Sequence, residues 1–377
     1  MDFDFNEVQE MLRKDSRRFL TEKCTKAYVR KMEEDEKGFT PDLWKEMAGL
    51  GWMGLVFPEK YGGLEMSFLE LTVLLEEMGR ACLPGPFFSA VFLGGLPILE
   101  AGTEEQKQEF LPKIAGGDMI VTTALTEPSG TYDPAGIELK ATAHGDHYIL
   151  EGTKLFVTDA HVADYMIVAA RTAADKTKGI TLFLVDAKSP GLKVSMLKTI
   201  ASDKQGEVVF DKVSVPKKNI LGKLNEGWPL IERLMQLAAA GKCAEMVGGA
   251  QQVLEMTVEY AKQRVQFGKP IGSFQAVQHH CANMATDVEG SRFITYQVAW
   301  MLSENMACTK EIAMAKAWVS DAYRRVVSLG HQVHGGIGFT KDHDMQLYFR
   351  RGKAAEAIFG DADLQREMVA CQLGLQS

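Results

Sequence analysis

Hydrophobic residues follow two different spacings along this chain, and the changes between them mark three parts. From residue 1 to about 118, apolar positions recur every three to four residues, as on one face of a helix. Between about 119 and 220 they form short apolar runs or alternate with polar residues, which is typical of strands. From about 221 to 377 the helical spacing returns. The pattern predicts an α+β protein, mostly α, with helical domains at 1–118 and 221–377 and an antiparallel β domain at 119–220.

Local signals agree with these boundaries. Capping boxes begin at Ser67 and Thr103, where a hydroxyl residue is followed three positions later by Glu70 or Gln106. In the middle part, strands are expected at 120–125, 148–157, 165–170, 180–185 and 208–213. In the last part, the small residues at 247–250 would let another helix approach closely.

One stretch of the last part, residues 260–278, joins two predicted helices and gathers unusual side chains. The first helix stops at 267–270, because Gly suits a helix C-terminus and Pro cannot continue the hydrogen-bond ladder. The next helix starts near Ser273. The corner carries a cation, two amides and two aromatic rings: Arg264, Gln266, Phe267, Phe274 and Gln275. Such a corner is suited to hold a phosphate and stack a planar ring, or it is an ordinary helical hairpin with a surface Arg.

Composition narrows the class of partner. Of the 377 residues, 46% are hydrophobic and 24% charged, which is ordinary for a globular protein. A net charge of −8 without a basic stripe argues against nucleic acid as a partner. The six cysteines have no paired spacing, so we expect neither a metal site nor disulfides, and a reducing compartment. No apolar run reaches membrane-spanning length and the N-terminus is acidic, which together predict a cytoplasmic protein.

Three segments resemble the signature of the acyl-CoA dehydrogenase family. They are residues 264–278 (RVQFGKPIGSFQAVQ), 332–339 (QVHGGIGF) and 126–128 (TEP), in the family's order and at its spacings. The resemblance covers essentially the whole chain. It implies a helical domain, a β domain and a C-terminal four-helix bundle, assembled as dimers or tetramers. It also implies FAD as cofactor and an acyl-CoA thioester as substrate, with a carboxylate that takes the proton at Cα while the flavin takes hydride from Cβ.

The same resemblance assigns the cofactor contacts. Leu125 and Thr126 would face the pyrimidine end of the flavin, Phe156 would pack on the isoalloxazine where the family commonly has Trp, and Thr158 would bond near N5. The pyrophosphate and adenine of a neighbouring subunit's FAD would be held by Arg264, Gln266, Phe267, Phe274, Gln275, Gln332, Gly335 and Gly336. The glycines matter because they let backbone N–H groups approach phosphate.

The substrate side departs from the family pattern. Tyr132 stands where a Ser often faces the CoA chain. Gly360 occupies the position of the family's usual Glu base, with its backbone N–H left to bond the thioester carbonyl, and Asp361 follows it. In other branches the base lies at the position of Ala238, which here would only line the substrate site.

Asp361 is therefore our first candidate for the base, against the alternative that it only caps the helix that follows. Glu245 lies two turns beyond Ala238 and points the same way, so it is the second candidate, or a helix-packing carboxylate.

The leading hypothesis is an FAD-dependent acyl-CoA dehydrogenase that passes electrons to an electron-transfer flavoprotein. The departures at 131–133 and 359–361 are most similar to a branch containing small subunits of pimeloyl-CoA-type and sterol side-chain dehydrogenases. A second hypothesis is therefore a non-catalytic or half-site partner in a hetero-oligomer, and a third is an acyl-CoA oxidase. Which acyl group is bound is left open by the sequence.

Overall fold

The computed structural model describes residues 5–175 and 178–375. The chain divides into two compact units that alternate along the sequence. The helical unit consists of Met1–Lys31, Ser67–Leu83 and Ala238–Ser377, and the mixed unit of Met32–Met66 and Pro84–Leu237. Two helices, α2 (Lys26–Glu34) and α7 (Trp228–Gln263), pass from one unit to the other.

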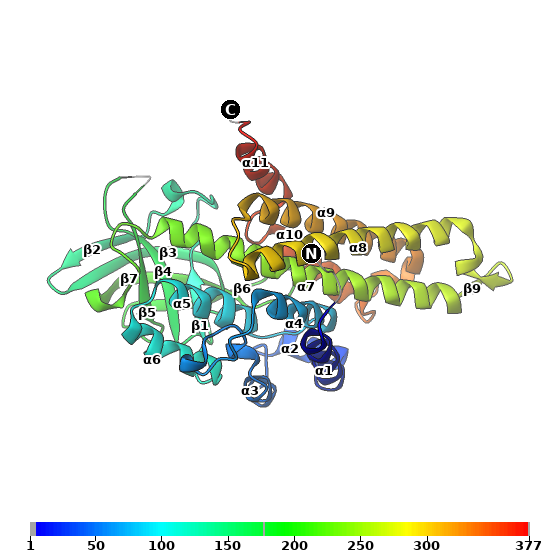
Figure 1. The fold of residues 1–377 in the computed structure, drawn as a ribbon, viewed down its shortest axis with the longest axis horizontal. Helices are drawn as coiled ribbons and strands as arrows, with labels where there is room; N and C mark the ends of the chain where they lie inside the picture. The colour runs from blue at the N-terminus through cyan, green and yellow to red at the C-terminus, as the bar shows by residue number, and fades with distance from the viewer. Residues whose placement is uncertain (1–4, 176–177, 376–377) are drawn as a thin grey trace. The chain divides into compact units, whose positions relative to one another are not determined.

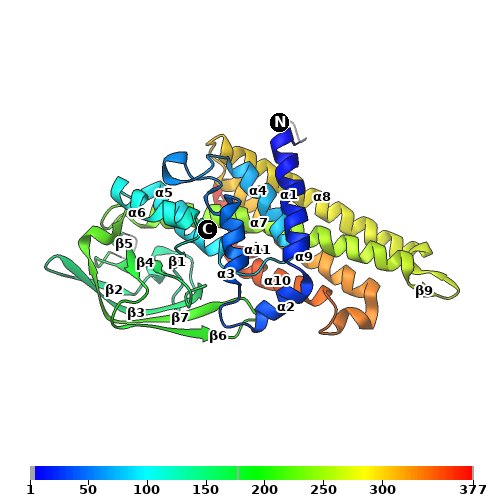
Figure 2. The ribbon, with the colours of Figure 1, turned by 90° about the horizontal axis from the view of Figure 1, so that it is seen from below.

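The mixed unit is built on one large sheet, with eight strands within the described residues. The strands are β1 (Val121–Ala124), β2 (Lys140–His144), β3 (His147–Thr158), β4 (Tyr165–Arg171), β5 (Ile180–Asp186), β6 (Leu192–Leu197), β7 (Gln205–Pro216) and β8 (Ile220–Leu221). Along the main path the order is β6-β7-β3-β2-β4-β5-β8, and Figure 2 shows β7 between β6 and β3. The five predicted strands are confirmed, whereas β2, β6 and β8 were not predicted. β8 has two residues, β2 is mostly exposed, and β6 has no fully buried position.

The sheet is mostly antiparallel, but β4 pairs in parallel with β1 and, at Lys140 opposite Arg171, with β2. β1 pairs with β4 in parallel, from Val121 opposite Tyr165 to Ala124 opposite Val168. A parallel pair needs a crossover rather than a hairpin, and the β2–β3 hairpin supplies it here. The unit also holds α3 (Pro41–Gly49), α5 (Leu96–Ala101), α6 (Glu104–Ala115) and a π-helical segment, Ser89–Gly95, that packs on β1.

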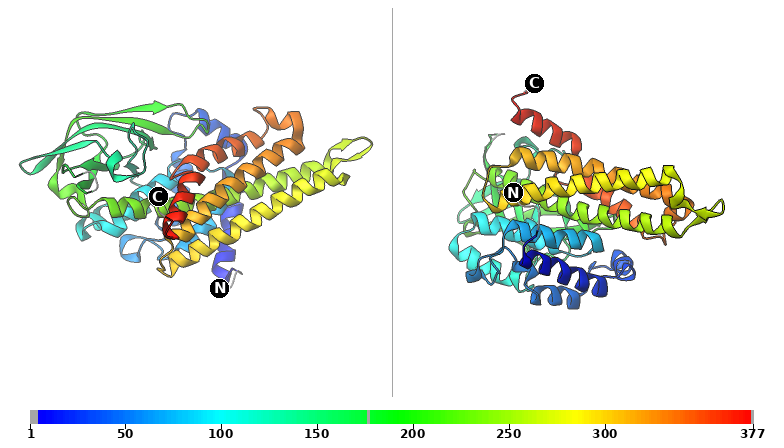
Figure 3. Two further views of the ribbon diagram at one scale, coloured as in Figure 1. Left: turned by 90° about the horizontal axis from the view of Figure 1, so that it is seen from above. Right: turned by 45° about the vertical axis from the view of Figure 1, so that its right-hand side comes forward.

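The helical unit contains α1 (Glu7–Lys23), α4 (Phe68–Ala81), most of α7, α8 (Gln275–Ser303), α9 (Thr309–His334), α10 (Met345–Ala357) and α11 (Ala362–Gln372). α7 and α8 run side by side to a small hairpin at their far end (Figures 1 and 3). The capping boxes of α4, at Ser67, and of α6, at Thr103, are confirmed. The close approach expected at 247–250 is confirmed too, since a β-carbon on Gly248 would lie 1.8 Å from the Glu76 carbonyl oxygen of α4.

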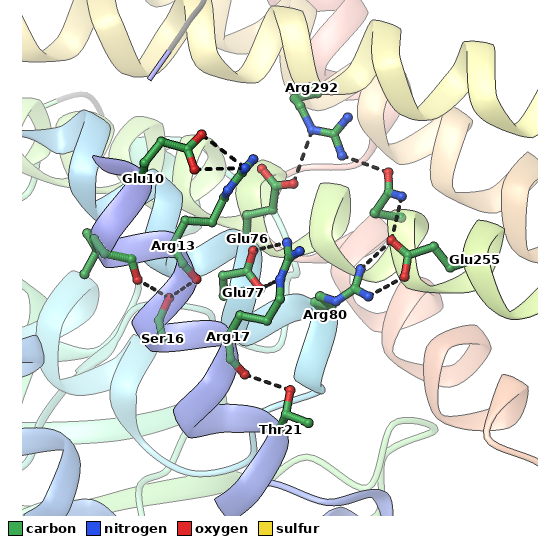
Figure 4. Close-up of polar contacts among 12 residues, drawn as sticks. Glu10, Arg13, Ser16, Arg17, Thr21, Glu76, Glu77, Arg80, Glu255 and Arg292 are labelled. Carbon is green, nitrogen blue, oxygen red and sulfur yellow. Dashed lines mark hydrogen bonds and ion pairs between the residues drawn. The ribbon is translucent and has the colours of Figure 1, made fainter. Parts of the chain in front are cut away.

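A network of ion pairs, which the hydrophobic pattern does not predict, joins the helices of this unit (Figure 4). Arg17 of α1 donates to Glu77 of α4 at 2.6 Å, and Arg292 of α8 donates to Glu76 of α4 at 3.2 Å. Glu77 is 2% exposed and Glu76 9% exposed, so both carboxylates depend on these partners. The network fixes how α1 and α8 lie on α4.

Across residues 5–175 and 178–375, every helix is too short or too polar to cross a bilayer.

Candidate functional site

The turn between α7 and α8 is exposed and shaped by two residues with positive φ. Phe267 (φ 53°) and Gly268 (φ 77°) form the two-residue loop between β9 (Val265–Gln266) and β10 (Lys269–Pro270). Two successive positive φ angles are the mark of a tight hairpin whose twist matches its strands. The helix therefore ends at Gln263, a few residues before the predicted stop. The Phe267 ring is 91% exposed.

The polar side chains of this turn also point to solvent. Arg264, Gln266 and Gln275 are all exposed. Phe274, expected beside them, is half-buried, and its ring lies 6.0 Å from that of Phe267 in an edge-on arrangement. The turn thus offers a guanidinium, amides and an uncovered ring to a ligand from outside the unit.

The end of α9 lies next to this turn. The ring of His334 stacks on that of Tyr260 with centroids 4.5 Å apart, which places the end of α9 beside the last turns of α7. Gln332 is exposed, and Gly335 has φ 61° with ψ −143°, a conformation that strongly favours glycine. A β-carbon on Gly335 or on Gly336 would meet nothing within 4 Å. Neither glycine is required by packing inside the chain.

These observations fit a phosphate-bearing cofactor. Open space beside two adjacent glycines leaves room for a phosphate to approach the backbone, and the exposed Arg264 supplies a fork of N–H donors nearby. The exposed Phe267 ring presents a flat apolar face. The residues therefore fit the pyrophosphate and adenine part of FAD.

In the mixed unit, the other predicted cofactor residues come from two segments joined by a backbone bond. Leu155 N–H donates to the Thr126 carbonyl at 2.8 Å, which places the loop after β1 beside β3. Thr122 Oγ1 donates to the Thr158 carbonyl at 2.7 Å and fixes the end of β3. Leu125, Thr126 and Thr158 are half-buried. The structure thus brings Leu125, Thr126, Phe156 and Thr158 together on one surface, which we call the wall.

Phe156 is the distinctive residue of that wall. It lies where the β3–β7 register shifts between Lys154 and Val157, has φ 55° and is 56% exposed. A bulky residue with positive φ is uncommon, and such strain concentrates at functional positions. The bulge turns the ring outward instead of into the sheet, which suits it to cover a planar ligand.

Beneath the wall lies an ion pair that sequence reasoning missed. Lys154 Nζ donates to Glu127 Oε1 at 2.6 Å and to the Leu125 carbonyl at 3.0 Å, and its side chain is fully buried. Glu127 also accepts the N–H groups of Glu138 and Leu139 at about 3 Å. Burial lowers the pKa of Lys154 to about 8, although Glu127 acts to raise it. The sequence feature that could have predicted this ion pair is a Lys on the inward face of a predicted strand, because a buried Lys needs an acidic partner.

Asp361, the first candidate base, lies at the start of α11, directly after Gly360. Asp361 is exposed and caps α11, because its Oδ1 accepts the Leu364 N–H at 3.0 Å. Asp361 therefore caps the following helix, as the alternative interpretation predicted. Among the described residues no hydrogen-bond donor reaches Asp361 Oδ2. Gly360 has φ 89°, and its carbonyl accepts a hydrogen bond from Lys316 at 3.1 Å.

The remaining predicted residues lie on helices or in a loop. Glu245 is partly buried and pairs with Lys242 at 2.5 Å on the same helix. Its backbone packs against α4, since a β-carbon on Gly79 would lie 2.0 Å from the Glu245 carbonyl oxygen. Ala238 is fully buried, and Tyr132 is half-buried in the loop after β1.

The chain is mostly helical with a central sheet, and its exposed α7–α8 turn beside two open glycines is compatible with a protein that binds a dinucleotide cofactor. Models of the acyl-CoA dehydrogenase N-terminal, middle and C-terminal domains match residues 6–118, 122–213 and 225–374. The chain belongs to the acyl-CoA dehydrogenase family, whose members are oxidoreductases that carry FAD.

Individual relatives match along their full length. A probable acyl-CoA dehydrogenase of Bacillus subtilis is 34% identical over 385 residues, covering 99% of this chain and 100% of the relative. A 3-(aryl)acrylate reductase of Clostridium sporogenes is 32% identical over 379 residues, covering 98% and 99%. Among solved structures, a chain of the ChsE4–ChsE5 complex from Mycobacterium tuberculosis matches with a TM-score of 0.91 at 29% identity. The match covers 100% of this chain and 100% of the matched chain.

Proposed function

We propose that this chain catalyses the FAD-dependent α,β-dehydrogenation of an acyl-CoA thioester and passes the electrons to an electron-transfer flavoprotein. The observation that carries the proposal is the exposed α7–α8 turn beside the open Gly335–Gly336 segment, in a chain that the family matches from end to end. When bound, FAD supplies the two-electron acceptor. The chain itself must hold the cofactor, orient the thioester and remove a proton.

The cofactor contacts are proposed in two groups. Leu125, Thr126, Phe156 and Thr158 would cover the flavin ring. The second group, at the ends of α7 and α9, would hold the pyrophosphate and adenine of the FAD of a neighbouring chain. Its members are Arg264, Gln266, Phe267, Phe274, Gln275, Gln332, Gly335 and Gly336. Exposure of so polar a turn, together with an uncovered ring, is what a shared site requires. Function would then need at least a dimer.

For proton removal we propose Asp361. Its Oδ1 is committed to the cap of α11, whereas Oδ2 remains available, and the positive φ of Gly360 determines how the chain enters the cap. The Gly360 N–H would bond the thioester carbonyl and make the α-proton more acidic. Tyr132 and Ala238 would lie along the substrate. Glu245 is the second candidate because it is partly buried on a rigid helix.

The variant Asp361→Asn tests this assignment cleanly. Asn caps a helix about as well as Asp, so the variant keeps α11 while it removes the base. The rate of flavin reduction by acyl-CoA in stopped flow should fall about a hundredfold or more. Glu245→Gln is the matched control. If Asp361→Asn retains a rate within a few-fold of wild type and Glu245→Gln does not, Glu245 is the base instead.

A second candidate function has a specific observation in its favour. The family's usual Glu position is Gly360, and a β-carbon there would lie 2.7 Å from Gln365 Nε2 and 2.9 Å from Leu364 Cδ2. Gly360 also has φ 89°, so a residue with a carboxylate there would be strained and would have to displace the Gln365 and Leu364 side chains. A chain that lends its FAD-holding segments to a catalytic partner, as a half-site subunit, would not need one.

The deciding experiment is made on the protein purified alone. We expect a yellow protein whose flavin absorbance is bleached by acyl-CoA and restored by an electron-transfer flavoprotein. Release of hydrogen peroxide in air at the full turnover rate would indicate an oxidase. A colourless chain that gains flavin only on mixing with a second subunit would indicate the half-site role.

A further inference from the structure

The turn between α10 and α11 has a conformation that ordinary residues avoid. Phe359 (φ 60°) and Gly360 (φ 89°) are both in the left-handed region, one after the other. A non-glycine residue there persists only when its surroundings hold it. Asp361 follows the turn directly, so the contacts that hold the turn also fix the position of the Asp361 backbone.

Two buried side chains hold the turn by its carbonyl groups. Lys316 of α9 is 0% exposed, and its Nζ donates to the Gly360 carbonyl at 3.1 Å. Gln365 of α11 is 4% exposed, and its Nε2 donates to the Phe359 carbonyl at 2.9 Å. Successive carbonyl groups are therefore bound from two different helices. We call Lys316 and Gln365 the turn clamp.

Lys316 also ties the turn to the helix before it. Its Nζ donates to the carbonyl groups of Ala355 and Glu356, each at 3.0 Å, near the C-terminal end of α10. A cation at this position satisfies carbonyl groups that lack an intrahelical partner and interacts favourably with the helix dipole. If the only need were to satisfy these carbonyl groups, an exposed side chain or a water molecule would be sufficient. A fully buried ammonium that reaches three carbonyl groups of two segments fixes their relative position as well.

A side chain at position 360 would push Gln365 out of its place in the clamp. Gln365 Nε2 occupies the space that a β-carbon on Gly360 would enter, at 2.7 Å. Gly360 therefore allows both the left-handed backbone and the Gln365 contact. The turn is therefore held from two helices and carries no side chain at its second residue.

We propose that Lys316 and Gln365 are positioning residues for proton abstraction, holding the Phe359–Gly360 turn so that the Gly360 N–H and Asp361 keep one geometry toward the thioester. This inference rests on the proposed function. Neither residue touches substrate, and each acts through the backbone. Because a displacement of about 1 Å can cost a hundredfold in rate, loosening the turn should slow the chemical step more than it weakens binding.

The test compares Lys316→Met and Gln365→Leu with the control Lys310→Met. Lys310 lies on the same helix, is 42% exposed, and forms an ion pair with Glu311. Two readouts are taken on the FAD-loaded protein: hydrogen–deuterium exchange of a peptide covering 357–364, and flavin reduction over a range of acyl-CoA concentrations. Both clamp variants should exchange faster in that peptide and lower the limiting reduction rate about tenfold or more. FAD content and half-saturating acyl-CoA should stay within a few-fold of wild type.

Faster exchange with an unchanged limiting rate would show that the clamp only stabilises the fold, which overturns the proposal. If Lys316→Met does not fold, Gln365→Leu and the milder Lys316→Gln decide the question by the same readouts. A wild-type flavin that no acyl-CoA thioester reduces would contradict the proposed function, and the positioning role would fall with it.

Discussion

At the scale of single residues, two cations of this chain are placed in opposite ways. Arg264 is exposed at the α7–α8 turn, so its guanidinium is available to a ligand. Lys154 is fully buried, and its ammonium is committed to Glu127 and to the Leu125 carbonyl. Removing the first should change ligand affinity, whereas removing the second should change stability.

Arg264→Ala should weaken FAD retention. The lost contact is a charge-assisted hydrogen bond worth about 1.5–3 kcal/mol, which corresponds to about a ten- to hundredfold rise in the dissociation constant. Flavin fluorescence during titration of the apoprotein measures it. Arg18→Ala on α1 is the control, because Arg18 is 72% exposed and its ion pair is with Asp15 on the same helix. Equal retention in the two variants would mean that Arg264 does not contact FAD.

Lys154→Met should lower the free energy of unfolding of the protein by about 3–5 kcal/mol, because Glu127 would stay buried without its cation. Adding Glu127→Gln should recover part of the loss, since a neutral amide costs less to bury. Urea unfolding measures both, with Lys193→Met on exposed β6 as the control. Additive losses in the double variant would mean that the two charges do not interact.

At the scale of elements, the helices are joined by contacts that hydrophobic spacing does not describe. Gly79 and Gly248 allow the backbones of α4 and α7 to touch, and the Arg17–Glu77 pair holds α1 on α4. At the other end of the unit, Lys316 of α9 caps α10. These contacts depend on individual glycines or charged side chains rather than on the spacing of apolar residues.

The buried Lys316 gives stability a defined pH dependence. Burial lowers its pKa to about 8, whereas an unfolded chain holds that proton up to about 10.4. Between these values the unfolded state binds more protons, so the contribution of Lys316 to stability rises with pH and is at its lowest below about 8. Relative to Lys316→Met, the wild type should gain up to about 3 kcal/mol between pH 8 and 10.5.

Urea unfolding of both proteins across this range provides the test. Burial raises the pKa of Cys24 and of Cys243, which lies near Lys316, to about 12 in each case. Both thiols therefore stay protonated in either folded protein over this range and drop out of the difference. Lys310→Met should show no such trend. A difference between wild type and Lys316→Met that does not change with pH would mean that the Lys316 ammonium keeps its ordinary pKa in the folded chain.

At the scale of the whole molecule, the proposed cofactor residues belong to two different units of the chain. Leu125, Thr126, Phe156 and Thr158 lie in the mixed unit, and the group around Arg264 and Gly335 lies in the helical unit. The second group is exposed, and the open space beside its glycines is filled by no part of the described chain. A neighbouring chain is the natural source of the FAD that it would hold.

Dilution should therefore release flavin as the assembly dissociates. Sedimentation velocity with detection at flavin absorbance should show colour only in a species of two or more chains. Stabilisation of the assembly by added FAD should follow, because ligand binding favours the state that binds it. A monomer that sediments with its full complement of FAD would contradict the shared site.

The sequence by itself determined the order of the helical and β parts and the positions of five strands of the sheet. Spacing and capping are local, so the boxes at Ser67 and Thr103, these five strands and the corner near Arg264 could be predicted from neighbouring residues. The small residues at 247–250 also predicted a close helix contact, because residues with little or no side chain leave room for a neighbouring helix.

Only the tertiary structure decided which distant residues meet. Lys154 and Glu127 are 27 residues apart, and their pairing depends on the β1 loop lying beside β3. The outward turn of Phe156 depends on a register shift between β3 and β7, which one strand alone does not encode. Lys316 reads in sequence as a polar interruption of the inner face of α9. Its role exists because α10 ends, and the Phe359–Gly360 turn begins, within reach of one buried ammonium.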